Sequence, residues 1–145
     1  MGDRTEGDIQ IEAEPEDVME VLVDFDAYPE WAGVESAEIL EEDDEGRPAA
    51  VAFRLSAMGL DASYTLEYAY APDDGGMSWT TREAGGALKD VAGEYVLEAS
   101  DDGTHVTYRL AVELAVAVPS LLRKQGEKRI VRTALEGLKR RVEEG

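Results

Sequence analysis

The feature that most constrains the fold is a change of hydrophobic period close to Pro119. Between residues 51 and 114, apolar and polar residues alternate along five consecutive segments separated by short turns such as APDDGG and SDDGT. Such alternation predicts half-buried strands, and the short turns predict an antiparallel meander with one apolar face. From Pro119 to about Glu143 apolar residues recur every three, four or seven positions, which predicts one long amphipathic helix that Gly126 interrupts.

The first third of the chain predicts three further elements. Residues 9–14 alternate as a strand, and residues 34–42 form a second, weaker strand pattern. Between them a helix is expected to start at Pro15, since proline suits a first turn, and to stop before Pro29, since the residue ahead of a proline avoids the helical region. A curved antiparallel sheet with the long helix across its concave face buries every apolar stripe.

Length and composition limit the class of protein. Residues 1–145 suffice for a single domain with its own core, in which residues 1–7 are expected to form a flexible tail. The absence of cysteine excludes disulfides and thiolate metal sites. The first residues lack an apolar signal region, and no segment approaches the roughly 20 apolar residues of a membrane span, so we expect a cytoplasmic protein.

Charge is unevenly distributed along this acidic chain, whose net charge is −19. Residues 1–45 hold eighteen acids and one base, whereas eight of the fourteen bases lie in the last twenty-three positions. The basic helix is either a solvated face that complements the acidic remainder or a surface for a phosphate or a partner protein. Nucleic-acid binding is disfavoured, because the net charge repels phosphate and no aromatic residues interleave with the bases.

Three segments resemble a known superfamily. IEAEPEDVMEVLVDFDAYPEWAGVESAEIL resembles the opening of START-like (SRPBCC) proteins, in particular their polyketide cyclase/dehydrase and lipid-transport branch. GEYVLEASDDGTHVTYRLAVEL resembles their last two strands, and LLRKQGEKRIVRTALEGLKRR their closing helix. The resemblance covers about residues 8–143. It implies an α+β helix-grip fold, with a curved antiparallel sheet wrapped around a long C-terminal helix, two short helices near the N-terminus, and a hydrophobic cavity between sheet and helix.

Aromatic residues gather on the expected inner face of the sheet. Several buried tyrosines around one apolar space favour a ligand pocket, because their hydroxyls need partners; a filled core with hydroxyls turned to solvent is the alternative. The candidate cavity residues are Tyr28, Phe53, Leu55, Tyr64, Leu66, Tyr68, Trp79, Tyr95, Tyr108, Leu110, Ile130 and Ala134.

No catalytic constellation is visible in the sequence. The expected inner face of the sheet carries no Asp, Glu, His or Lys, so no catalytic residue, metal or cofactor is assigned. The single histidine, His105, is expected in an exposed turn, and the acidic run EEDDE lacks the ligand spacing of a calcium loop. Arg54, Arg82 and Arg109 are expected to face outward.

Three functions remain open. The first is binding or carriage of a small hydrophobic ligand such as a lipid, a polyketide or an isoprenoid. The second is a polyketide cyclase, dehydratase or aromatase, in which Tyr64, Tyr68 and Tyr108 would donate to a substrate carbonyl. The third is a protein-interaction module that uses the basic helix. A monomer or weak homodimer is expected.

The segment DFDAYPEWAG marks a corner of the fold. Pro29 is expected to end the first helix, Trp31 to be structural, and Tyr28 to lie at the edge of the pocket. Met58, Met77 or residues 83–88 are candidates for closing the pocket, the last as a lid or as an ordinary loop.

Overall fold

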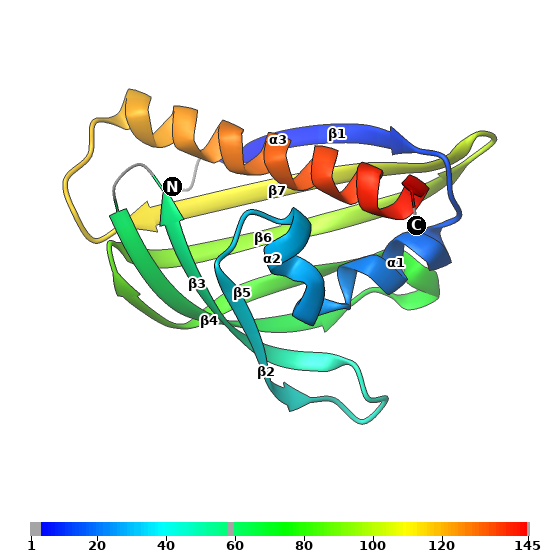
Figure 1. The fold of residues 1–145 in the computed structure, drawn as a ribbon, viewed down its shortest axis with the longest axis horizontal. Coiled ribbons are helices and arrows are strands. Elements are labelled where there is room, and N and C mark those ends of the chain that lie inside the picture. The colour runs from blue at the N-terminus through cyan, green and yellow to red at the C-terminus, as the bar shows by residue number, and fades with distance from the viewer. Residues whose placement is uncertain (1–3, 58–59, 145) are drawn as a thin grey trace.

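A single antiparallel sheet dominates the computed structural model, which describes residues 4–57 and 60–144 (Figure 1). Its seven strands lie in the order β1-β7-β6-β5-β4-β3-β2, so the meander from β2 to β7 is completed by β1 beside β7. The strands are β1 (Thr5–Ile11), β2 (Ser36–Glu42), β3 (Pro48–Ala57), β4 (Leu60–Tyr70), β5 (Gly76–Gly86), β6 (Leu88–Ser100) and β7 (Gly103–Leu114).

One long helix and two short ones cover one face of the sheet. Helix α3 (Ser120–Glu144) packs along β1 and β7, and α1 (Pro15–Leu22) and α2 (Tyr28–Trp31) pack against it (Figure 1). The single-turn 3-10 helices are η1 (Phe25–Ala27) and η2 (Pro72–Asp74). This arrangement confirms the expected helix-grip fold. No helix among the described residues has the length and apolarity needed to cross a membrane.

Two segments differ from their expected structure because they pair within the sheet. Strand β1 begins at Thr5 and pairs with β7, so residues 5–7 are not part of a tail. Residues 83–86 pair with residues 62–65 of β4, and Leu88 opens β6, so the expected loop or lid over residues 83–88 is wrong. Gly86 turns the chain there with a φ of +68°, a conformation that favours glycine. Met58 lies outside the described residues.

The proline corner also differs from its expected structure. Helix α1 ends at Leu22, and Pro29 lies in the first turn of α2 instead of ending the preceding helix. The reason is that the first turn of a helix needs no N–H donor, so proline is accepted there. Pro29 therefore lies after the break between α1 and α2, at the start of the second helix.

The arginines on the strands face outward, as expected. Arg82 pairs with Glu41 and Glu67, Arg109 pairs with Glu6 and Glu94, and Arg54 is exposed. The bridges of Arg109 and the Arg82–Glu67 bridge join neighbouring strands on the solvent face, whereas the Arg82–Glu41 bridge reaches from β5 to β2. Exposed pairs of this kind contribute little to stability. They reinforce the register of the sheet without contributing to the inner face.

Trp31 packs α2 against α3. The indole is 7% exposed, and its ring lies 4.8 Å from the ring of Tyr28. Beneath it, a Cβ built on Gly137 would overlap the carbonyl oxygen of Trp31. Glycine at this position of α3 therefore allows the two helices to approach closely.

We expect Gly137→Ala to destabilise the protein by about 1–3 kcal/mol, because the added methyl group forces α2 away from α3. Urea unfolding measures the change. Glu136→Ala, one residue earlier on the exposed side of α3, is the matched control and should stay within about 0.5 kcal/mol of the wild type. Equal effects of the two variants would contradict the close approach at Gly137.

We expect Trp31→Ala to lower the free energy of unfolding by about 3–5 kcal/mol, because it removes a large buried ring. Trp31→Phe should cost much less. It keeps an aromatic ring and removes an indole N–H that is buried without a hydrogen-bond partner among the described residues. A phenylalanine variant as unstable as the alanine variant, measured by thermal unfolding, would contradict a packing role for the ring.

Candidate functional site

A cavity of about 290 Å³ lies between the concave face of the sheet and α3. Its wall comes from inward-pointing residues of β3 to β7 and from the middle of α3, and it is mostly apolar. The strands supply alternate residues because successive side chains of a strand point to opposite faces of the sheet. The cavity is therefore a direct product of the period-two pattern.

The structure places every residue of the predicted set in this wall, and their contact with a ligand remains a prediction. The residues are Tyr28, Phe53, Leu55, Tyr64, Leu66, Tyr68, Trp79, Tyr95, Tyr108, Leu110, Ile130 and Ala134. Met77, named as a residue that closes the pocket, also lines it. Trp31 does not line the cavity.

Two tyrosine hydroxyls have backbone partners. Tyr28 donates to the carbonyl of Leu22 at 2.5 Å, and Tyr70, which lies outside the cavity wall, donates to the carbonyl of Pro48 at 2.6 Å. The sequence analysis expects Tyr28 at the edge of the pocket. Tyr28 is only 6% exposed, so it is instead a buried part of the wall. Burial raises the pKa of the Tyr28 hydroxyl well above its usual value.

Four other tyrosine hydroxyls belong to the wall and have no hydrogen bond to any described residue. They are those of Tyr64, Tyr68, Tyr95 and Tyr108. Burial raises the pKa of all four above the usual value, so they are neutral O–H donors at physiological pH. Such donors are available to a ligand that carries acceptor oxygens.

Aromatic packing fixes the positions of these donors. The rings of Tyr95 and Tyr108 lie 4.5 Å apart, and Trp79 packs 5.5 Å and 5.7 Å from them. Phe53 stacks on Tyr64 at 5.4 Å, and Tyr68 lies 5.8 Å from Trp79. Contacts at these distances stabilise aromatic pairs and restrict ring rotation. The polar atoms are therefore carried on a rigid apolar wall.

Glu127 is a buried carboxylate of the wall that sequence reasoning missed. It is 2% exposed, and its Oε1 accepts from Thr5 Oγ1 at 2.6 Å. Its Oε2 accepts from the N–H of Val112 at 3.2 Å and from Arg123 at 3.1 Å, and Arg123 also donates to the Val112 carbonyl at 3.3 Å. Because β1 pairs with β7 only up to Leu110, this ion pair replaces the missing strand partner of Val112.

The spacing of α3 contained a signal for Glu127. It lies four residues before Val131, which is followed at helical spacing by Ala134 and Leu138, so it continues the buried stripe of the helix. The carboxylate accepts hydrogen bonds from three donors, which are Thr5, the N–H of Val112 and Arg123. This favours a structural role over acid–base chemistry.

Some wall residues are exposed and mark the mouth of the cavity. They are Gly33, Ser56, Arg129 and Thr133. They come from the segment after α2, from the end of β3 and from α3, so the cavity opens between the helix and the β2–β3 side of the sheet. The mouth thus carries polar groups, whereas the interior is aromatic.

His105 lies away from the cavity. It belongs to β7 rather than to a turn, and its Nε2 lies 2.9 Å from Asp8 of β1, so the expectation of a loop residue is wrong. The strand extends to Gly103 because this end of β7 pairs with β6 on one side and, from Thr104 onward, with β1 on the other. Within residues 4–57 and 60–144, no group of three or more metal-ligating side chains is found.

Comparisons with solved structures support the fold. A START superfamily protein from Mycobacterium smegmatis has 19% identity and a TM-score of 0.86, with 97% of each chain covered. The Zhui aromatase/cyclase from Streptomyces sp. R1128 has 17% identity and a TM-score of 0.83, with 99% of this chain and 94% of that chain covered. A STAR-related lipid transfer protein from Xanthomonas axonopodis has 24% identity and a TM-score of 0.73, with 97% and 85% covered.

Family membership rests on a match to nearly the whole sequence. No curated protein matches the chain. The family model described as polyketide cyclase/dehydrase and lipid transport matches residues 3–143. The chain therefore belongs to the polyketide cyclase/dehydrase and lipid transport family.

Proposed function

We propose that the protein binds or carries a small hydrophobic ligand with acceptor oxygens in the cavity beneath α3. The four unpartnered hydroxyls of Tyr64, Tyr68, Tyr95 and Tyr108 on an otherwise apolar wall carry this proposal. Apolar pockets with a few convergent polar groups are typical of small-molecule sites. A ligand without acceptors would leave these donors unpaired, which disfavours a plain hydrocarbon.

The size of the cavity restricts the ligand further. About 290 Å³ is close to the lower end of the roughly 300–1,000 Å³ range of ligand pockets. A compact ring system, a short isoprenoid or a single polyketide-like chain suits this volume better than a two-chain lipid. Of the charged wall residues, Glu127 and Arg123 neutralise one another, so the interior favours an uncharged ligand.

The proposal predicts a preference for ketones over hydrocarbons of the same shape. Displacement of the neutral fluorophore N-phenyl-1-naphthylamine measures the affinities of 2-acetylnaphthalene and 2-ethylnaphthalene. The ketone should bind about fivefold more tightly than the hydrocarbon, because it gains one hydrogen bond from a tyrosine hydroxyl. Phe substitution at Tyr64, Tyr68, Tyr95 or Tyr108, made singly, should identify the donor by abolishing the preference.

Three matched controls accompany these variants. Tyr28→Phe changes a wall residue whose hydroxyl is already bonded to Leu22, and Tyr70→Phe changes a tyrosine outside the wall. Trp31→Ala lowers stability but lies outside the wall, so it should leave the ketone preference intact. No displacement by either compound, or equal affinity for both in the wild type, would contradict the proposal.

Catalysis on a polyketide-like substrate is the second candidate. It is favoured by the same neutral hydroxyls, since a phenol can donate to a substrate carbonyl and stabilise the negative charge that develops on its oxygen. The wall of aromatic rings would hold a reactive poly-ketone chain in a folded shape. Membership of a family that includes cyclases is consistent with this role.

A catalytic tyrosine is identified by measuring the turnover of a poly-β-ketone thioester in Phe variants of the wall tyrosines. Mass spectrometry of the cyclised products gives the rate. Removal of one essential donor should lower the rate about 10²–10³-fold. Tyr28→Phe, whose hydroxyl is engaged by the backbone, is the control. Unchanged turnover in Phe variants of Tyr64, Tyr68 and Tyr108 would exclude catalysis through these residues.

A further inference from the structure

Part of the basic surface of α3 has no acidic partner within residues 4–57 and 60–144. Among the bases of this helix, Arg123 and Lys124 approach Glu127, Lys139 pairs with Glu143, and Arg141 pairs with Glu30; these contacts fit a solvated, structural face.

Four further bases of α3 are exposed, and no carboxylate of a described residue pairs with them. One is Arg140, near the end of the helix, and the other three are Lys128, Arg129 and Arg132. In a chain with 33 acids and 14 bases, most bases could find an acidic neighbour. Three unpaired bases within two turns of one helix therefore form a local positive surface.

An exposed apolar segment lies beside these bases. Of the four large hydrophobic residues that are exposed within the described part of the chain, Val116, Leu121 and Leu122 fall within seven positions, and Leu121 is 70% exposed. The fourth, Leu40, lies alone on β2. Clustered exposed apolar residues are typical of interaction sites, whereas single ones are ordinary.

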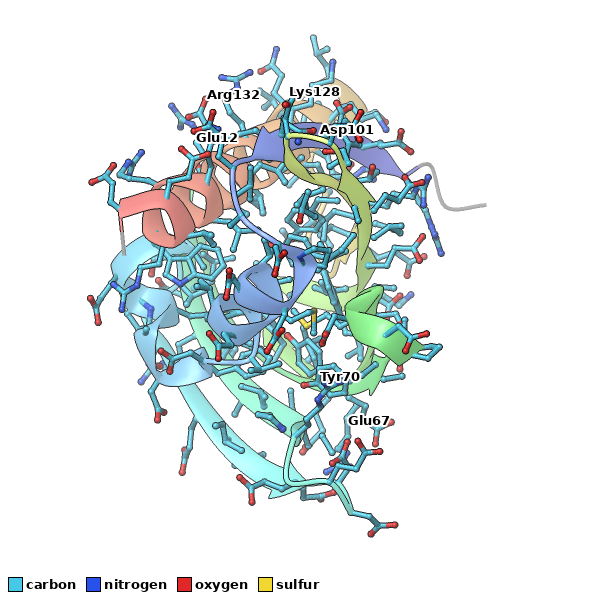
Figure 2. The ribbon with its side chains drawn as sticks, turned by 90° about the vertical axis from the view of Figure 1, so that its right-hand side faces the viewer. Glu12, Glu67, Tyr70, Asp101, Lys128 and Arg132 are labelled. Carbon is cyan, nitrogen blue, oxygen red and sulfur yellow. The ribbon has the colours of Figure 1, made fainter. Side chains whose placement is uncertain are left out.

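Helical spacing places the leucines and the bases on one outer side of α3. At about 100° per residue, Leu122 and Arg129 project nearly opposite the buried stripe of Glu127 and Val131. Leu121, Lys128 and Arg132 project from the adjoining flank, roughly 100–140° from Glu127. Figure 2 shows Lys128 and Arg132 pointing away from the sheet, and Figure 1 shows the loop before α3 at one extreme end of the molecule. We name Val116, Leu121, Leu122, Lys128, Arg129 and Arg132 the outer face of α3.

The outer face adjoins the cavity. Arg129 belongs both to the outer face and to the mouth. Val118, which lies between Val116 and Leu121 in the sequence, lines the cavity wall. A flat partner that covers the outer face would therefore lie next to the mouth. A bilayer would then receive or supply an apolar ligand near its own surface.

The geometry points to docking of the outer face on a bilayer that contains anionic lipids. Leu121 and Leu122 reach the boundary between headgroups and acyl chains, while Lys128, Arg129 and Arg132 contact lipid phosphates. A bilayer supplies both an apolar layer and a plane of negative charge, which is the combination that the outer face presents. The inference rests on the proposed function, because docking serves exchange of the cavity ligand.

Vesicle flotation of the full chain tests the docking. Wild-type protein should float with vesicles of phosphatidylcholine and phosphatidylglycerol, less with phosphatidylcholine alone, and less as salt is raised. Lys128→Gln combined with Arg132→Gln should lower partitioning about 25-fold, at roughly fivefold for each base. Leu121→Ser combined with Leu122→Ser should lower it about tenfold or more.

Control residues that are likewise exposed lie elsewhere on the molecule. Leu40→Ser removes an exposed leucine from β2, and Arg54→Gln removes an exposed base from β3; neither should change flotation. Absence of wild-type binding to anionic vesicles, or equal losses in the controls, would overturn the inference. Analytical ultracentrifugation provides a further check: a dimer that Leu121→Ser disrupts would show that a second copy covers the outer face.

A parallel measurement separates this inference from the proposed function. Binding of N-phenyl-1-naphthylamine in solution, without vesicles, reports on the cavity alone. Probe binding without vesicle binding would overturn the docking and leave the proposed function standing. Vesicle binding without probe binding would overturn the proposed function and remove the purpose of the docking, but not the contact itself.

Discussion

The cavity depends on how α3 is held across the sheet, at two supports with a gap between them. Near its start, the carboxylate of Glu127 joins the helix to Thr5 of β1 and Val112 of β7. Near its end, Gly137 brings the helix against the backbone of Trp31. Both contacts are close and well defined, so the helix cannot settle deeper onto the concave face. Between the supports one side of the helix, with Val131 and Leu135, packs on Gly7 of β1. The other side, with Ile130, Thr133 and Ala134, borders a space of about 290 Å³.

The wall under the helix combines rigidity with unused hydrogen-bonding capacity. Most buried polar groups in proteins have partners, and Tyr28 follows this rule through its bond to Leu22. Tyr95 and Tyr108 are equally buried, but their hydroxyls are directed into a space lined by rings. Among the described residues, the only buried side-chain polar atom without a partner is the indole nitrogen of Trp31, so the tyrosine hydroxyls are open to the cavity space and free to donate to a ligand there.

Alternation along the strands places Tyr64, Trp79 and Tyr108 on the same inner face as the structure does, because this pattern depends only on neighbouring residues. Features that depend on contacts between residues far apart in the sequence cannot be predicted from this alternation. The Gly85–Gly86 pair is typical of a turn, yet pairing with β4 extends the strand through it. Glu127 has the charge of a surface residue, and only the unpaired edge of β7 explains its burial. Local pattern predicts faces, whereas strand ends and buried charges require tertiary contacts.

A net charge of −19 repels an anionic surface, but this repulsion is short-ranged in salt. At physiological ionic strength the Debye length is about 8 Å, so charges farther away than this are largely screened. The acidic turn between β2 and β3 lies at the opposite edge of the sheet from β1 and β7, along which α3 packs (Figure 1). The nearest acidic element is β1, which packs against α3 and carries the exposed carboxylates of Glu6 and Asp8. Glu6 pairs with Arg109 and Asp8 with His105, whereas Lys128 and Arg132 have no carboxylate partner among the described residues. Contact with an anionic surface therefore depends on Lys128 and Arg132 approaching the lipid phosphates within about one Debye length, where their local field outweighs the net charge of the chain.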